Sequence, residues 1–258
     1  MRHPAVSKND KQMTFSSHLT ELRQRLIKCV IALVITTIIC FIPPVSKRIF
    51  DFLIDPAPDF IREHLIYVEM TGMLATYFKV ALMGGLVLAM PILVYQVIMF
   101  VSPALTRREK KYVYLALPWI TLMFIAGFAF GYFVAVPPAA NFLLTFMTDV
   151  ARPEIKIDSY ISIVTRFLVA IGIVFETPVI ITFLARLGIV KPETLSKRRR
   201  WAIVLAFILA AIITPTFDPI NQSIVAMPLI ILYEMSIWLA KIAYRRRAAA
   251  AESSDYLS

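Results

Sequence analysis

The chain has 258 residues, of which 59% are hydrophobic and 17% are charged, and its formal net charge is +10. Long apolar runs separated by charged segments are typical of membrane-spanning helices, and a water-soluble domain of this length does not need so many apolar side chains. The composition therefore excludes an ordinary soluble domain. Cytoplasmic loops rich in lysine and arginine explain the positive charge more simply than nucleic-acid binding does.

The first predicted element is an amphipathic helix that leads directly into a membrane span. Residues 1–15 are polar, and we expect them to be disordered. The helix begins at about His18, where apolar residues start to recur at helical spacing. The span is predicted over about 27–42, and the pair Pro43 and Pro44 ends it.

Five further spans are predicted, and charged or proline-containing loops separate them. A mixed loop over 45–72 precedes the second span, and Pro137 and Pro138 end the third span before an outer loop over 139–158. Pro178 lies inside the fourth span, where neighbouring helices can satisfy the freed backbone groups. The further spans are predicted at about 77–101, 112–136, 160–184, 201–213 and 223–240.

The fifth and sixth predicted spans are short. Thirteen residues of helix reach about 20 Å, whereas the hydrocarbon core of a bilayer is about 30 Å thick. A re-entrant hairpin is one interpretation of this pair. We favour a short spanning hairpin that thins the bilayer locally, because basic segments at 197–200 and 245–247 flank the pair on the same side.

The distribution of charge predicts the orientation. The N-terminal segment, the loops at 102–111 and 185–200 and the tail at 241–258 carry 20 lysines and arginines, whereas the opposite loops carry 5. The sequence thus predicts one all-α, polytopic membrane domain over 1–258, with six transmembrane helices and both termini in the cytoplasm. No internal repeat is visible, which disfavours an inverted-repeat transporter.

Four ionisable residues fall inside predicted spans, where a charge is costly. Lys79 and Arg166 lie near outer ends, and their side chains can reach towards the membrane surface. Glu176 lies well inside the fourth span, so we expect it to face a polar cavity, a partner helix or a proton path. For Glu234 a functional and a structural role are equally supported.

Two acids stand out at the predicted cytoplasmic boundary, among basic neighbours. Glu21 and Glu109 can take part in solvated salt bridges, and Glu21 stands four residues before Arg25 in the favourable order. Alternatively, their carboxylates can bind a cationic partner through bidentate arginine contacts. Asp218 and Gln222 lie in the last outer turn. Ordinary turn chemistry explains Asp218, and Gln222 can hydrogen-bond an entering peptide or a neighbouring helix.

No catalytic constellation is visible, so we do not expect an enzyme, a metal site or a bound cofactor. The sequence contains no His-Glu-x-x-His, Gly-x-Ser-x-Gly or glycine-rich phosphate motif. One functional class stays open on the residues alone, a proton-coupled secondary transporter of a small solute that uses Glu176.

Four segments, in order along the chain, resemble motifs of the TatC family, the multispanning core of the twin-arginine protein translocase. The first is 17–26, which reads Ser-His-Leu-Thr-Glu-Leu-Arg-Gln-Arg-Leu, and the second is 100–105 followed by Glu109. The third is 175–178, Phe-Glu-Thr-Pro, and the fourth is Thr-Pro at 214–215 followed by Asp218 and Gln222. Pro219 departs from the pattern of the family.

The resemblance implies a concave, glove-like bundle of six helices in the cytoplasmic (inner) membrane, with short fifth and sixth helices. It implies a receptor and scaffold for the transport of folded proteins across the membrane, driven by the proton gradient. The implied partners are twin-arginine signal peptides, single-span TatA- and TatB-like proteins, the lipid bilayer and further copies of the chain in a complex, with no nucleic acid. The resemblance also implies roles for single residues. The signal-peptide site is formed by Glu21, Arg23, Phe100 and Glu109. Glu176 lines the concave face within the bilayer, and Asp218 and Gln222 lie at the outer mouth, where partner proteins make contact.

Overall fold

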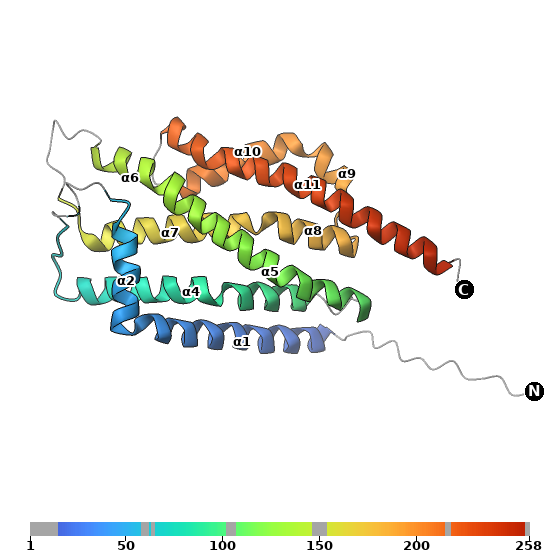
Figure 1. Ribbon diagram of the computed structural model, residues 1–258, viewed down its shortest axis with the longest axis horizontal. Coiled ribbons are helices and arrows are strands. Elements are labelled where there is room, and N and C mark those ends of the chain that lie inside the picture. Colours follow the sequence, from blue (N-terminus) through green and yellow to red (C-terminus); the bar gives the residue numbers. More distant parts are fainter. Residues whose placement is uncertain are drawn as a thin grey trace, which may run out of the picture.

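The computed structural model is a bundle of long helices that lie side by side (Figure 1). It describes residues 15–57, 62, 65–101, 107–145, 154–214 and 218–255, and for 15–17, 101, 107–116, 144–145 and 246–255 it describes the backbone alone. The elements in chain order are α1 (Phe15–Phe41), α2 (Pro43–Ile54), α4 (Gly72–Val101), α5 (Arg107–Phe130), the π-helix η2 (Gly131–Ala135), α6 (Val136–Thr145), α7 (Ile157–Phe175), α8 (Thr177–Leu187), α9 (Pro192–Lys197), α10 (Arg199–Ile213) and α11 (Pro219–Asp255).

The bundle has two distinct ends (Figure 1). Helices α1 and α5 begin at one end, which we call the entry end, and α4, α8 and α11 finish there. Helix α2 crosses the other end, which we call the α2 end. There a single parallel bridge joins Ile66 to Lys156, so that the segments before α4 and α7 are tied together. The start of α1 and the finish of α11 therefore lie at the same end.

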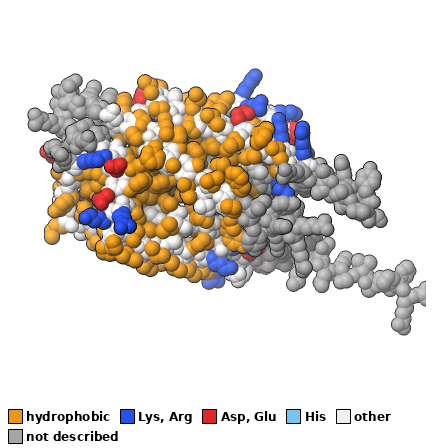
Figure 2. Space-filling view, viewed as in Figure 1, with side chains coloured by type: hydrophobic (Ala, Val, Ile, Leu, Met, Phe, Trp, Pro, Cys, Tyr) orange, Lys and Arg blue, Asp and Glu red, His pale blue; other side chains and the backbone are white. Residues whose placement is uncertain are grey.

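Five helical segments of the described chain are long and apolar enough to cross a membrane. Figure 2 shows a broad apolar surface in the middle of the molecule, with charged side chains gathered towards both ends. The chain is therefore an all-helical, multi-pass membrane protein, as the sequence predicted. The five segments are His18–Phe41, Gly72–Phe100, Leu117–Leu143, Ile157–Leu187 and Pro219–Arg245.

The structure confirms one predicted helix stop and corrects another. Helix α1 ends at Phe41, before Pro43 and Pro44 as predicted, but these prolines open α2, so the predicted loop over 45–72 begins as a helix. The third predicted span does not end at its proline pair, because the helical path continues as α6. Pro137 and Pro138 lie in the first turn of α6, after η2, where the Val136 N–H donates to the Gly131 carbonyl. A proline has no N–H to lose in a first turn, and the wider π-turn makes room for the ring.

The structure also changes the predicted fourth and sixth spans, whereas the fifth stays short. The fourth span is two helices, α7 and α8, which meet at Glu176. The fifth, α10, has 15 residues and is about 22 Å long, so it is short as predicted. The prediction of a short sixth helix is wrong, because α11 has 37 residues and continues through Pro228. Pro228 interrupts one backbone hydrogen bond without ending the helix.

Glycines allow the closest helix contacts of the core. Gly85 of α4 lies against the backbone of Thr37 of α1, and Thr36 Oγ1 donates a hydrogen bond of 2.7 Å to the Gly85 carbonyl. Gly172 of α7 lies against the ring of Phe124 of α5. Small residues at such points let membrane helices approach without a hydrophobic driving force between them. The buried cluster around Leu168 and Ile171 links α4 and α7 to α2 and α11.

Candidate functional site

The entry end holds a carboxylate that is only partly used. The Arg25 Nε donates to Glu21 Oε1 at 2.9 Å, and the Arg25 Nη2 contacts the same oxygen. Arg25 Nη1 also donates to the Gln96 side chain of α4 at 3.3 Å. Glu21 Oε2 is buried and has no hydrogen-bond partner among the side chains that the structure describes. The predicted pairing of Glu21 with Arg25 is therefore present, and it engages one oxygen of the two.

An aromatic stack stands beside this ion pair. The rings of His18 on α1 and Phe100 on α4 lie 4.4 Å apart and are inclined by 19°. Helix α1 thus contacts α4 through both the stack and the bond from Arg25 to Gln96. Sequence reasoning missed Gln96, although an amide inside an otherwise apolar run was a usable signal.

The structure separates Arg23 from the other proposed members of this site. Arg23 is exposed, and residues two positions apart on a helix project from different faces, so it does not lie on the Glu21 side of α1. Glu109 belongs to the first turn of α5, and α5 begins at the entry end (Figure 1). The Glu109 side chain lies outside the described residues. The structure therefore brings Glu21 and Phe100 together and places the backbone of Glu109 at the same end of the bundle.

Glu176 lies at the junction of α7 and α8, and its side chain is 1% exposed. Its backbone carbonyl accepts from the N–H groups of Val179 and Ile180. Neither carboxylate oxygen has a hydrogen-bond partner in the described part of the chain. The carboxyl group thus lies inside the bundle, in a setting that disfavours its charged form unless a partner or water enters.

Asp218 and Gln222 have clear local roles at the start of α11. Asp218 caps this helix, because its two oxygens accept from the N–H groups of Ile220 at 3.3 Å and Asn221 at 3.0 Å. Pro219 occupies the first helical position, which suits proline. The Gln222 amide donates to the Phe207 carbonyl of α10 at 2.9 Å. The expected hydrogen bond to a neighbouring helix is therefore present.

Glu234, whose role the sequence left open, pairs with Arg199. Arg199 Nη2 donates to Glu234 Oε2 at 2.9 Å, and Arg199 Nε lies 2.8 Å from Oε1. This fork joins α10 to α11, and Tyr233 adds a hydrogen bond to the Leu195 carbonyl of α9. The geometry assigns Glu234 a structural role in holding the last helices together.

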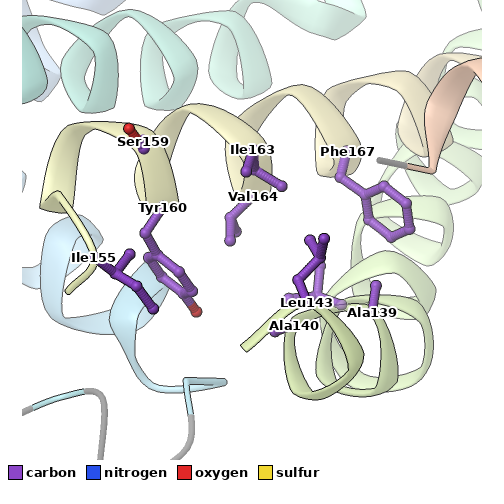
Figure 3. Close-up of a pocket in the computed structure, with 10 residues that line it drawn as sticks. Ala139, Ala140, Leu143, Ile155, Ser159, Tyr160, Ile163, Val164 and Phe167 are labelled. Atoms are coloured by element: carbon purple, nitrogen blue, oxygen red, sulfur yellow. The ribbon is translucent and has the colours of Figure 1, made fainter. Parts of the chain in front are cut away.

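A partly open cavity lies near the α2 end, far along the bundle from the ion pair of Glu21 and Arg25 (Figure 1). Figure 3 shows side chains of α6 and α7 facing each other across it, with Tyr160 projecting between the two helices. Its volume is about 220 Å³, and its lining is almost entirely apolar. Tyr160 Oη is buried without a hydrogen-bond partner among the described residues. This lining carries no arrangement of acids, bases or nucleophiles.

Comparisons with known proteins agree with the helical architecture and the motifs. The model of the family "Sec-independent protein translocase protein (TatC)" matches residues 17–228. The chain is similar to TatC of Carboxydothermus hydrogenoformans, with 40% identity over 90% of this chain and 94% of that protein. TatC of Desulforapulum autotrophicum is 37% identical, with 97% of this chain and 94% of that protein covered.

A solved structure supports the same assignment. The fold is similar to a crystal structure of the twin arginine translocase receptor TatC, with a TM-score of 0.74 and 39% sequence identity. That match covers 88% of this chain and 99% of the other. The chain therefore belongs to the TatC family and is a multi-pass membrane component of the Sec-independent protein translocase.

Proposed function

We propose that this chain is the receptor for twin-arginine signal peptides and the scaffold for transport of folded proteins, driven by the transmembrane proton gradient. The observation that carries the proposal is the Glu21 carboxylate, which has one oxygen paired with Arg25 and the other without a described partner. A buried carboxylate oxygen in that state favours a further charge-assisted donor. A guanidinium of the signal peptide supplies one.

Phe100 and Glu109 complete the proposed site. The ring of Phe100 stacks on His18, and the face of an aromatic ring attracts a guanidinium through a cation–π contact. Glu109 stands in the first turn of α5 and provides a second carboxylate for the second arginine. Arg23 serves in this proposal as an exposed cation that repels lysines and arginines outside the motif.

The membrane arrangement is part of the same proposal. We infer that α10 is a sixth crossing, shorter than the bilayer core and accommodated by local thinning. The entry end then faces the cytoplasm, because 20 of the lysines and arginines lie in segments assigned to that side. The membrane is the cytoplasmic (inner) membrane, and Glu176, which is buried at the junction of α7 and α8, is the group that responds to protons. Single-span TatA- and TatB-like partners dock near Asp218 and Gln222, and the working complex contains several copies of the chain.

The alternative of a small-solute transporter has less support. A buried acid such as Glu176 suits proton coupling in either class of protein. Membership of a protein-translocase family favours the larger substrate.

Binding of a twin-arginine peptide to the full chain in detergent tests the receptor proposal. We expect Glu21→Ala to weaken binding about tenfold or more, since a hydrogen bond to a charged group is worth about 1.5–3 kcal/mol. Glu21→Ala combined with Glu109→Ala should weaken it further, and Glu193→Ala is a matched control that removes an exposed acid from α9. Undiminished binding by the double variant would refute the proposed site.

A further inference from the structure

A groove between α4 and α7 combines cations with a long apolar wall. It has a volume of about 490 Å³, and it begins with Lys79 and Arg166. Its walls continue towards the middle of the bundle through Leu82 and Leu86 of α4 and Val169 and Ile173 of α7. Both helices run from the α2 end towards the entry end (Figure 1), so the cationic part is nearer the α2 end.

The two cations of the groove differ in their partners. Lys79 forms an ion pair with Asp158, and its Nζ also lies 3.0 Å from Ser162 Oγ. Arg166 is exposed and forms no ion pair or hydrogen bond with any residue in the described ranges. Lys79 and Asp158 offset each other, so the groove retains one positive charge on Arg166.

The depth of Arg166 in the membrane places its guanidinium within reach of an anionic group at the membrane surface. Arg166 stands nine residues into the segment Ile157–Leu187, which is about 14 Å from its start. That segment has 31 residues and is about 46 Å long, so about 8 Å extends beyond each side of a hydrocarbon core about 30 Å thick. The Arg166 backbone then lies about 6 Å below the hydrocarbon boundary. An arginine side chain can span that depth to the phosphate layer.

We propose that this groove binds one anionic phospholipid from the leaflet at the α2 end. Its phosphate contacts the Arg166 guanidinium and the outer face of Lys79, and one acyl chain lies along Leu82, Leu86, Val169 and Ile173. The order of the groove matches the order of a phospholipid, with charge at the membrane surface and hydrocarbon towards the centre. The unpaired guanidinium supplies the charge complementarity, and a bidentate contact to phosphate suits it.

Lipid binding to the full chain in detergent micelles tests the proposal. The probes are phosphatidylglycerol, phosphatidylcholine and inorganic phosphate, and the readouts are lipids retained in native mass spectrometry and the shift in unfolding temperature on titration. We expect phosphatidylglycerol to bind more tightly than phosphatidylcholine. Arg166→Gln should weaken phosphatidylglycerol binding about fivefold or more, since a cation near the membrane surface contributes about 1 kcal/mol per charge.

Two further variants test separately whether lipid binding depends on the charge at Arg166 and on the open space of the groove. Arg48→Gln removes an exposed arginine from α2 at the same end of the molecule, and it should leave lipid binding unchanged. Ala170→Leu fills the groove without changing its charge, and it should reduce the lipid retained. Each expectation can be read from both the mass spectra and the unfolding temperatures.

Several outcomes would overturn the proposal. Equal binding of the two lipids, or full phosphatidylglycerol binding by Arg166→Gln, would show that the guanidinium selects no anionic lipid. Equal stabilisation by inorganic phosphate alone would show that the apolar wall holds no acyl chain. Binding of a transmembrane peptide that carries one glutamate, without binding of phosphatidylglycerol, would make the groove a helix-docking site instead.

Discussion

Replacement of Gly85 by alanine should destabilise the protein by forcing α1 away from α4. A Cβ atom at Gly85 would lie 2.5 Å from Thr37 Oγ1 and 2.7 Å from the Cα and N atoms of Thr37. Carbon atoms in contact prefer separations of about 3.5–4.0 Å, so the helices must move apart by roughly 1 Å. Backbone atoms cannot rotate away as a flexible side chain can.

The cost follows from what that movement breaks. It lengthens the hydrogen bond of 2.7 Å from Thr36 to the Gly85 carbonyl, and it loosens the packing of α1 on α4. Overpacking of a well-packed contact costs about 1–3 kcal/mol. For a chain of this size, about 2 kcal/mol corresponds to a fall in unfolding temperature of roughly 4–8 °C.

Thermal unfolding of the purified protein in one detergent provides the assay. Gly72→Ala in the same helix is the matched control, because its Cβ would meet its nearest neighbour at an ordinary 3.5 Å. The movement should also separate His18 from Phe100, so Gly85→Ala should weaken twin-arginine peptide binding although it touches no proposed contact. An unchanged unfolding temperature for Gly85→Ala would refute the close approach of α1 and α4.

The other predictions concern buried and paired polar groups. Glu176→Gln should keep or raise the unfolding temperature, because the buried carboxylate has no described partner, whereas Glu176→Ala should lower it by leaving a cavity. In a transport assay Gln should retain more activity than Ala, and equal losses would show instead that an ionisable group is required. A double-mutant cycle on Arg199→Gln and Glu234→Gln should give a coupling of about 0.2–1 kcal/mol, because both side chains are about half exposed, and a coupling of zero would contradict a stabilising fork. Tyr77→Phe should cost about 1 kcal/mol through loss of the bonds to Ser46 and the Phe41 carbonyl, with exposed Tyr67→Phe as the control that should change nothing.

The sequence predicted an all-helical membrane protein because a bilayer imposes a long and simple pattern. Apolar runs of sufficient length are visible without knowledge of their neighbours. One pair of prolines misled the prediction, since α1 does end before Pro43, whereas the helical path continues through Pro137, which lies in the first turn of α6. The difference depends on the preceding turn, which is a single bend before Pro43 and a π-helix before Pro137.

The candidate site was predictable only in part, for a similar reason. Glu21 and Arg25 are four residues apart, so their pairing follows from helix geometry alone. The bond from Arg25 to Gln96 joins residues 71 positions apart, and the fork between Arg199 and Glu234 joins residues 35 positions apart. Such contacts depend on how helices pack, which local spacing does not determine.

The exposed side of α1 should vary in sequence among related chains more than the side that packs against α4. Val30, Ile31, Val34, Ile35 and Ile38 are about half exposed, in a span that faces hydrocarbon. Fluid acyl chains have no fixed shape to match, so interchange among leucine, isoleucine, valine and phenylalanine on this side is nearly neutral. The side that touches Gly85 has no such freedom. Related chains should therefore diverge along one flank of a single helix while the opposite flank stays constant.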